Sequence, residues 1–221
     1  MIRVLLVDDQ VLVRAGLRML LETGDGLVAA GEAGDGHEAV RRSRELRPDV
    51  VLMDLHMPGM DGVTATERIV AELPRTRVLA LSTFDLEENV VAALRAGASG
   101  FLPKDVSPEE LIEGIRIVHR GEATLAPRLL LRLIATFVRP SRPRAVEVPA
   151  ELSALTVRER QMLELIAHGL SNQEIADDTG LALSTVKNRV SDLFAKLGVR
   201  DRAQAVIVAY EAGLVTPGRR G

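Results

Sequence analysis

The sequence predicts an α/β domain with a doubly wound five-stranded parallel sheet, followed by a smaller all-α domain. Three observations carry this prediction. Short apolar runs alternate with stretches of helical periodicity over residues 1–121, whereas helical periodicity alone continues over residues 152–216. A segment studded with prolines separates the two. Strands that are apolar throughout and spaced by single helices are typical of a parallel sheet covered on both faces.

The first domain consists of five β-α units. Its expected strands are 2–7, 27–33, 50–53, 77–82 and 99–102. Its expected helices are 11–21, 36–46, 63–72, 87–95 and 109–120. Five such units are enough for one doubly wound domain, with any functional site at the carboxyl ends of the strands.

Residues 122–151 are predicted to be a linker, in which residues 128–137 could form a short helix and Pro140, Pro143 and Pro149 favour an extended chain. Beyond the linker, Thr156 and Ser171 each precede a glutamate by three residues. This capping-box spacing predicts helices that begin near residues 157 and 172.

Two further helices are expected after these. Ser184 is a plausible N-cap for a helix that reaches residue 197 and ends at Gly198. Asp201 could cap the last helix, which would run to Gly213. The helices near 157–168, 172–179 and 184–197, joined by short turns, form a helix-turn-helix pattern.

Composition excludes several classes of protein. Cysteine is absent, so there are no disulfides and no thiolate metal sites. No apolar run of about 18 residues and no secretory signal pattern occurs, so we expect a soluble cytoplasmic protein with no membrane partner. The net charge is −3, but residues 1–125 carry −7 and residues 126–221 carry +4. Only the second half is therefore expected to meet a polyanion.

Five polar side chains gather at the carboxyl edge of the predicted sheet. They are Asp8 and Asp9 after the first strand, Asp54 after the third, Ser82 after the fourth and Lys104 after the fifth. Three carboxylates without cysteine suit a hard cation, Mg²⁺ in particular. One carboxylate could then act as nucleophile towards a phosphoryl group, whose oxygens the lysine and hydroxyl would stabilise.

Each of these residues also has a purely structural interpretation. Asp8 or Asp9 alone would more often cap the following helix, and Asp54 alone could form a turn. Ser82 could satisfy a strand end, and Lys104 could be a solvated surface charge. Their common position at one edge of one sheet favours a shared site.

The N-terminal motifs resemble the receiver domain of two-component response regulators, a flavodoxin-like fold, over residues 1–121. The resemblance rests on Val7-Asp8-Asp9, Met53-Asp54-Leu55-His56-Met57-Pro58-Gly59-Met60-Asp61-Gly62, Ser82-Thr83 and Gly100-Phe101-Leu102-Pro103-Lys104. It implies that Asp54 accepts a phosphoryl group from a sensor histidine kinase. It also implies that Asp9, Asp54 and the main-chain carbonyl of His56 bind Mg²⁺, with Asp8 acting largely through water.

The same resemblance assigns the remaining pocket residues. Lys104 would pair with the phosphoryl oxygens, Ser82 would turn inward to the phosphate, and Phe101 would follow into the vacated space. The protein would not be an enzyme beyond self-catalysed phosphotransfer and slow autodephosphorylation.

Two positions depart from the family pattern. Pro103 precedes the lysine, whereas the family usually has proline directly after it, and this leaves the approach of Lys104 to the pocket open. His56 lies two residues after the phosphoacceptor. Either only its carbonyl takes part, which we favour, or its imidazole impedes the attacking water and lengthens the life of the phosphoaspartate.

The third C-terminal helix would lie in the DNA major groove if this pattern binds DNA. Helical spacing directs Val186, Val190, Leu193 and Leu197 to the core and leaves Thr185, Lys187, Asn188 and Ser191 outward. Arg189 and Arg200 are expected to contact the DNA backbone. The alternative is a small helical bundle with a solvated basic face.

The C-terminal motifs resemble the LuxR/NarL-type output domain over residues 152–216. The resemblance rests on residues 155–160, 169–176, 184–187 and 196–199. It implies contacts to double-stranded DNA from Asn172, Thr185, Lys187, Asn188 and Ser191. It also implies dimerisation through the last helix, by Ala205, Val206, Ala209 and Tyr210. Where the family often has Thr-His, this chain has Asn188-Arg189. The DNA sequence that it binds therefore cannot be inferred from the sequences that other family members bind.

Taken together, the motifs predict a response regulator in which phosphorylation of Asp54 controls DNA binding, as a homodimer when active. One alternative is an aspartyl-phosphate hydrolase, but such enzymes normally have an acidic residue where this chain has His56. A second alternative is a DNA-binding protein whose N-terminal domain serves only as a dimerisation scaffold.

Overall fold

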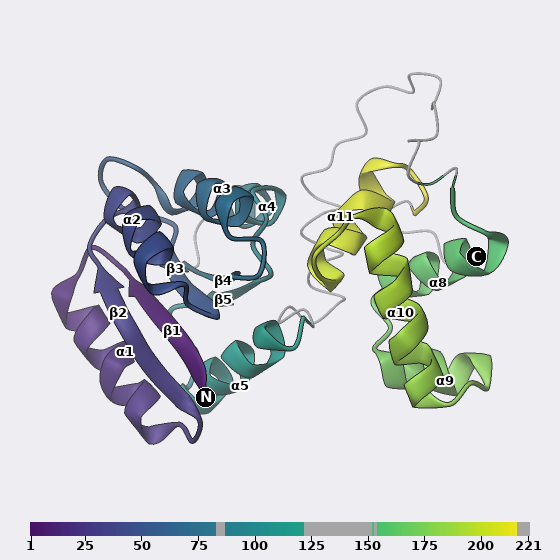
Figure 1. Cartoon of the computed structure of the whole chain (residues 1–221), viewed down its shortest axis with the longest axis horizontal. Coiled ribbons are helices and arrows are strands. Elements are labelled where there is room, and N and C mark those ends of the chain that lie inside the picture. Colours follow the sequence, from purple (N-terminus) through teal and green to yellow (C-terminus); the bar gives the residue numbers. More distant parts are fainter. Residues whose placement is uncertain (83–86, 122–151, 153, 216–221) are drawn as a thin grey trace. The chain divides into compact units, whose positions relative to one another are not determined.

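The computed structural model describes residues 1–82, 87–121, 152 and 154–215, with side chains for all of these except 87–89 (Figure 1). The chain divides into two compact units, Met1–Thr124 and Leu125–Gly221. The predicted linker at 122–151 and the short helix at 128–137 lie outside the described residues. Those two assignments therefore stay predictions.

The first unit is a five-stranded sheet with one helix after each strand, as the sequence predicts. The strands are β1 (Ile2–Val7), β2 (Leu27–Ala33), β3 (Val50–Asp54), β4 (Arg77–Ser82) and β5 (Gly100–Pro103). The helices are α1 (Val11–Thr23), α2 (Gly36–Leu46), α3 (Gly62–Glu72), α4 (Glu87–Arg95) and α5 (Pro108–His119). All neighbouring strands are parallel, in the order β2-β1-β3-β4-β5. The chain thus changes direction along the sheet between β1 and β3, where such folds place their sites.

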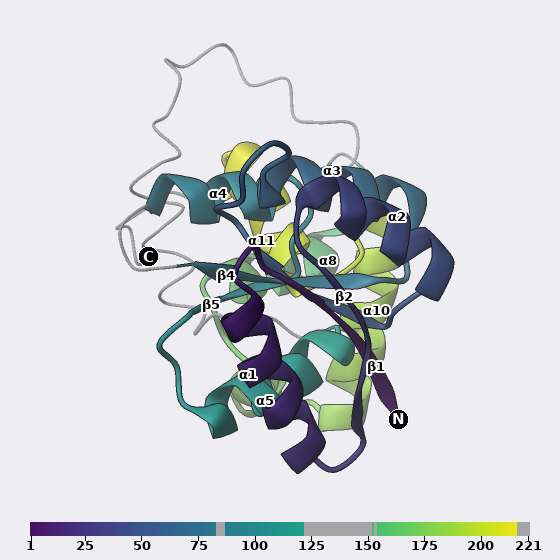
Figure 2. The same cartoon turned by 90° about the vertical axis from the view of Figure 1, so that its left-hand side faces the viewer.

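Helices cover both faces of this sheet, with α2, α3 and α4 on one side and α1 and α5 on the other (Figure 2). Successive strand side chains point to opposite faces. Leu5 and Val51 join the cluster beneath α2 and α3, while Leu6 and Leu52 pack towards α1 and α5. Because both faces are buried, the strands carry no polar alternation, which explains their continuous apolar sequences.

Three helices of this unit begin at residues whose side chains cap them, and α1 does not. The side chains of Asp35, Asp61 and Ser107 accept hydrogen bonds from the first turns of α2, α3 and α5. Helix α1 instead begins after Gln10, which makes no side-chain capping bond. The interpretation of Asp8 or Asp9 as the cap of α1 is therefore wrong, because neither occupies the capping position.

The second unit contains the four helices that the sequence predicts. They are α8 (Val157–Ala167), α9 (Asn172–Thr179), α10 (Leu183–Leu197) and α11 (Arg202–Glu211). Capping boxes at Thr156 and Ser171 and the side-chain cap of Asp201 are confirmed. Across the described ranges of the chain, no helix is both long and apolar enough to span a membrane.

The N-cap of helix α10 lies two residues earlier than expected. Its N-cap is Ala182, which has no side-chain acceptor, so the prediction of Ser184 as N-cap is wrong. The first turn closes through the backbone N–H of Val186, which donates to the carbonyl of Ala182 at 3.1 Å. The left-handed Gly180 ends α9 two residues before this. A backbone bond, rather than a hydroxyl cap, thus closes the first turn of this helix.

The core of the second unit lies where α8, α10 and α11 meet. Leu163, Ile166, Val186 and Leu193 are almost fully buried. Arg202 on α11 is also buried, and its guanidinium donates to the carbonyl of Leu170 and, at 3.1 Å, to Oδ1 of Asn172. This arginine therefore ties α11 to the turn that begins α9.

The close approach of Gly62 to β3 generates a first prediction. A Cβ at position 62 would lie 2.0 Å from the carbonyl oxygen of Asp54 and 2.8 Å from Cα of Leu55. Both are backbone atoms and cannot yield easily, so Gly62→Ala should lower the free energy of unfolding by about 1–3 kcal/mol. Gly16→Ala is the matched control, because nothing lies within 4 Å of its new methyl group. It should raise helix stability by about 0.5–1 kcal/mol. Urea unfolding measures both, and equal effects would contradict the packing argument.

A second prediction concerns Glu159, whose carboxylate accepts from Lys196 at 2.7 Å and from Thr156. These bonds lower the pKa of Glu159 to about 2 from its ordinary 4.5. A depressed folded-state pKa contributes stability above the unfolded value, and that stability is lost as the pH falls through the folded one. Glu159→Gln can still form the capping box but lacks the charge. It should melt at a lower temperature than the wild type at neutral pH.

The difference in melting temperature should shrink between pH 4.5 and about 2. NMR signals of α8 and α10, followed through thermal unfolding, report on this unit alone. Asp178→Asn, which removes an exposed carboxylate on α9, is the control and should show no such pH-dependent difference. A gap that stays constant over this range would rule out the carboxylate of Glu159 as its source.

Candidate functional site

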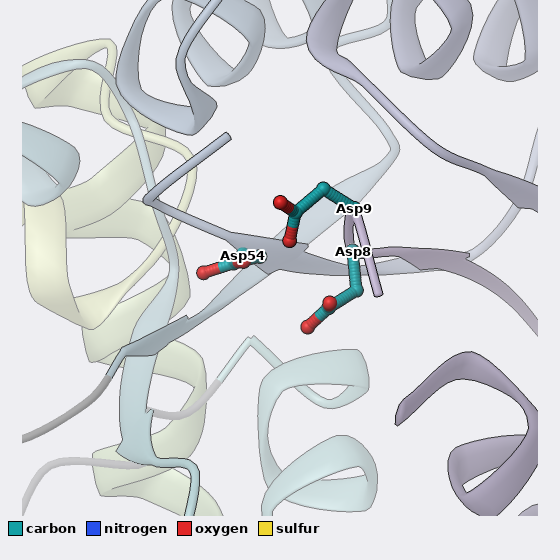
Figure 3. Close-up of side chains that lie close together, drawn as sticks. All are labelled: Asp8, Asp9 and Asp54. Carbon is teal, nitrogen blue, oxygen red and sulfur yellow. The ribbon is translucent and has the colours of Figure 1, made fainter. Parts of the chain in front are cut away.

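Three carboxylates meet at the carboxyl edge of the sheet, as predicted. Oxygen atoms of Asp8, Asp9 and Asp54 all lie within 4.8 Å of one another (Figure 3). Asp8 and Asp9 follow β1, and Asp54 is the last residue of β3, its neighbour in the sheet. Asp8 and Asp54 are 0% and 2% exposed, whereas Asp9 is exposed. The cluster therefore has two buried members and one that faces solvent.

Lys104, the residue after β5, reaches into this cluster. Its Nζ lies 2.7 Å from Oδ2 of Asp8 and 2.8 Å from Oδ2 of Asp54. Pro103 pairs with Ser82 as the last residue of the edge strand, a position that tolerates proline. The N–H of Lys104 then donates to the carbonyl of Ser82 at 2.9 Å. The unusual order of proline and lysine thus does not keep the ammonium from the pocket.

Burial and ion pairing set the charges here. Burial raises the pKa of Asp54, and the hydrogen bonds from Lys104 and from the His56 N–H only partly oppose it. Burial alone would lower the pKa of Lys104, but its bonds to Asp54 and Asp8 outweigh this and leave that pKa raised. The ammonium thus stays charged, and Asp54 is a carboxylate whose negative charge depends on nearby cations.

Ser82 and His56 form the rim of the pocket. Ser82 is 1% exposed at the end of β4, and its Oγ lies 3.4 Å from Nδ1 of His56. The backbone N–H of His56 donates to Oδ1 of Asp54 at 3.1 Å. The imidazole therefore lies at the site rather than away from it. Both roles predicted for His56, a carbonyl ligand alone or an imidazole that impedes the attacking water, stay predictions. Phe101 is half-buried within β5.

Arg14 is a residue that sequence reasoning missed. It lies in the first turns of α1, and its Nη1 donates to the main-chain carbonyl of Asp8 at 2.7 Å. Its Nε donates to Glu32 of β2 at 3.1 Å. The available signal was a single arginine after the apolar start of a helix, directly beyond the two aspartates. From the sequence alone, such a residue is interpreted as a surface charge, because its partner Glu32 comes close only when β1 and β2 pair in the sheet.

The predicted DNA-reading helix has the expected two faces. Val186 and Val190 of α10 are buried, and Thr185 is partly exposed. The exposed polar residues of this helix include Lys187, Asn188, Arg189 and Ser191. Arg200 differs from expectation, because its side chain is only 14% exposed and its Nε lies 3.5 Å from Asp201. This pairing argues against the DNA-backbone contact expected of Arg200.

Asn172 is partly buried, and the acceptor of its amide is already used by Arg202. The four residues expected to form a dimer surface, Ala205, Val206, Ala209 and Tyr210, are 0%, 3%, 0% and 8% exposed. Helix α11 packs against α8 and α10. These four side chains are thus largely buried in the single chain, and both the dimer surface and dimerisation itself stay predictions.

Two protein families match the chain. The family described as "Response regulator receiver domain" matches residues 4–116, and "Bacterial regulatory proteins, luxR family" matches residues 153–209. Among curated relatives, the "Uncharacterized transcriptional regulatory protein YxjL" of Bacillus subtilis is 41% identical over 97% of each chain. The "Response regulator protein VraR" of Staphylococcus aureus is 39% identical over 97% of this chain and 99% of its own.

Solved structures agree with these matches. The chain is similar to the response regulator ChrA of a heme-sensing two-component system, with 36% identity, a TM-score of 0.51 and coverage of 97% of this chain and 98% of ChrA. It is also similar to a LuxR-family response regulator from Aurantimonas sp. SI85-9A1, with 36% identity and a TM-score of 0.55, over 60% of this chain and 94% of that one. The chain therefore belongs to the two-component response regulators and is a transcriptional regulator that joins a receiver domain to a LuxR-family DNA-binding domain.

Proposed function

We propose that Asp54 is the phosphoacceptor of this response regulator and that its phosphorylation controls DNA binding by the C-terminal unit. One observation carries the proposal. Asp54 is a buried carboxylate within 4.8 Å of two others, and the ammonium of Lys104 lies 2.8 Å from its Oδ2. Burying so much negative charge is costly unless the site binds cations or transfers an anionic group.

The reaction follows from the chemistry of the residues. A carboxylate oxygen of Asp54 attacks the phosphorus of a phosphohistidine on a sensor histidine kinase. A P–O bond forms, the P–N bond breaks, and the imidazole leaves with its electron pair and takes up a proton. The His56 N–H holds Oδ1 of Asp54 during this step, and Lys104 and Ser82 stabilise the phosphoryl oxygens.

The donor set fits Mg²⁺. Three carboxylates within 4.8 Å, with no cysteine in the chain, are the oxygen-rich environment that hard cations prefer. We assign Asp9, Asp54 and the main-chain carbonyl of His56 as ligands and expect Asp8 to act largely through water. When bound, Mg²⁺ neutralises the repulsion between the carboxylates and the incoming phosphoryl group.

Phosphorylation would then act as a two-state switch. Ser82 moves towards the phosphoryl group, Phe101 follows, and the face formed by α4, β5 and α5 changes. Moving an equilibrium from 1:99 to 99:1 requires about 5.5 kcal/mol. Charge-assisted hydrogen bonds contribute about 1.5–3 kcal/mol each, so two or three contacts to the phosphoryl oxygens reach this range. The active state is proposed to be a homodimer on double-stranded DNA, which supports a cytoplasmic location.

The alternative of a hydrolase is not supported. The family matches are regulators, and His56 occupies the position where such hydrolases carry an acid. Activity is instead proposed to be limited to self-phosphorylation and slow autodephosphorylation. The structure also offers no reason to regard the N-terminal unit as a scaffold alone, since its carboxylates and lysine are assembled.

The proposal is tested by treating the protein with acetyl phosphate and Mg²⁺. The wild type should gain one phosphoryl group by mass spectrometry, and its affinity for a selected operator duplex should rise. Asp54→Asn should show neither change, whereas Asp105→Asn, which alters an exposed carboxylate beside Lys104, should behave as the wild type. Labelling of Asp54→Asn would refute the assignment of Asp54 as the phosphoacceptor. Labelling of the wild type without a change in DNA affinity would refute the proposal that phosphorylation controls DNA binding.

The DNA-reading role of α10 gives a separate prediction. Lys187 is exposed near the start of this helix, so Lys187→Gln should weaken binding to duplex DNA. If Lys187 contacts a phosphate, the slope of the logarithm of affinity against that of salt concentration should fall by about 1. Lys196→Gln removes the same charge from the other end of α10 and should leave the slope unchanged. Equal slopes for wild type and Lys187→Gln would exclude the phosphate contact.

A further inference from the structure

The guanidinium of Arg14 connects the acidic pocket to the second strand of the sheet. Nη1 donates to the main-chain carbonyl of Asp8 at 2.7 Å, and Nε donates to Oε2 of Glu32 at 3.1 Å. The side chain is only 14% exposed. The same group thus binds both the turn after β1 and a residue of β2.

Glu32 is itself firmly held. It lies opposite Leu6 in the register of β1 and β2. Its other oxygen accepts from Nε of Arg18 at 2.9 Å. The hydrogen bond from Arg18, followed by that from Arg14, lowers the pKa of Glu32 despite the opposing effect of burial. Glu32 therefore remains an anion on a rigid strand and is a stable anchor for Arg14.

This anchor determines the direction of the aspartate turn. A peptide bond is planar, so holding the carbonyl of Asp8 also orients the N–H and Cα of Asp9. The N–H of Asp8 donates to Ala33 at 3.2 Å, and Oδ1 of Asp8 accepts from the N–H of Gln10 at 2.9 Å. Asp9 is exposed and has no comparable side-chain bond among the described residues. Its direction towards Asp54 (Figure 3) therefore depends on its backbone.

We infer that Arg14 is a positioning residue for the divalent cation, which it does not touch, and that it acts by holding the Asp8 carbonyl and so the carboxylate of Asp9. This inference rests on the proposed Mg²⁺ site. The opposite effect, repulsion of the cation by the arginine, is weak because Glu32 compensates the charge of Arg14 at 3.1 Å. Outer partners of metal ligands typically change metal affinity 10- to 100-fold when they are removed.

The test is a titration of the full chain with Mg²⁺, followed by amide NMR. Arg14→Gln should raise the dissociation constant about tenfold or more, and Arg14→Lys should lie between it and the wild type. Arg44→Gln is the matched control. It breaks an arginine–glutamate bridge between α2 and α3, to Glu72, that has no contact with the aspartate turn. Its dissociation constant should equal that of the wild type.

The outcomes separate this inference from the proposed function. If the wild type binds no Mg²⁺, the proposed metal site fails and the inference fails with it. If the wild type binds and a folded Arg14→Gln binds equally well, only the role of Arg14 is overturned. The amide spectrum without Mg²⁺ shows whether each variant is folded. If Arg14→Gln is not, Arg14→Lys decides, because one ammonium cannot replace both donors, and an unchanged dissociation constant would overturn the inference.

Discussion

The buried ion pairs of Lys104 with Asp8 and Asp54 are the interaction on which the first unit depends. Two carboxylates at adjacent strand ends repel each other, and burial increases the cost of their charge. Lys104 offsets this cost from the edge strand, and it reaches the pocket because its N–H continues the pairing with Ser82. The sheet order β2-β1-β3-β4-β5 places the ends of β1 and β3 next to each other and the end of β5 beyond β4, all at the same edge of the sheet. The topology thus brings the buried carboxylates together with an ammonium that compensates part of their charge.

Other contacts in the first unit restrain the residues at this edge of the sheet. Gly62 lets α3 begin against the backbone of Asp54, and the bond from the His56 N–H restrains one oxygen of Asp54. On the other side, Arg14 and Glu32 restrain the aspartate turn. The apolar clusters on both faces of the sheet hold these strands in register. The pocket can therefore be preorganised on rigid elements, which is what precise phosphoryl chemistry requires.

The second unit differs from the first, because its small core carries a helix, α10, that exposes a polar face. Capping boxes at Thr156 and Ser171 start two of its helices with local bonds. The guanidinium of Arg202 donates hydrogen bonds to the turn at the start of α9 instead of facing solvent. The buried side of α11 fills the core against α8 and α10.

The sequence by itself determined the strands, the helices, the capping boxes and the set of residues at the sheet edge, because these follow from periodicity and from local bonds. It misplaced the N-cap of α10 and the expected exposure of Arg200, which local patterns do not determine. Only the tertiary structure decided that Lys104 reaches the pocket after Pro103, that His56 lies against Ser82, and that Arg14 holds the Asp8 carbonyl. Such contacts join side chains from different elements, and their geometry is set by strand register and helix packing, which local patterns do not encode.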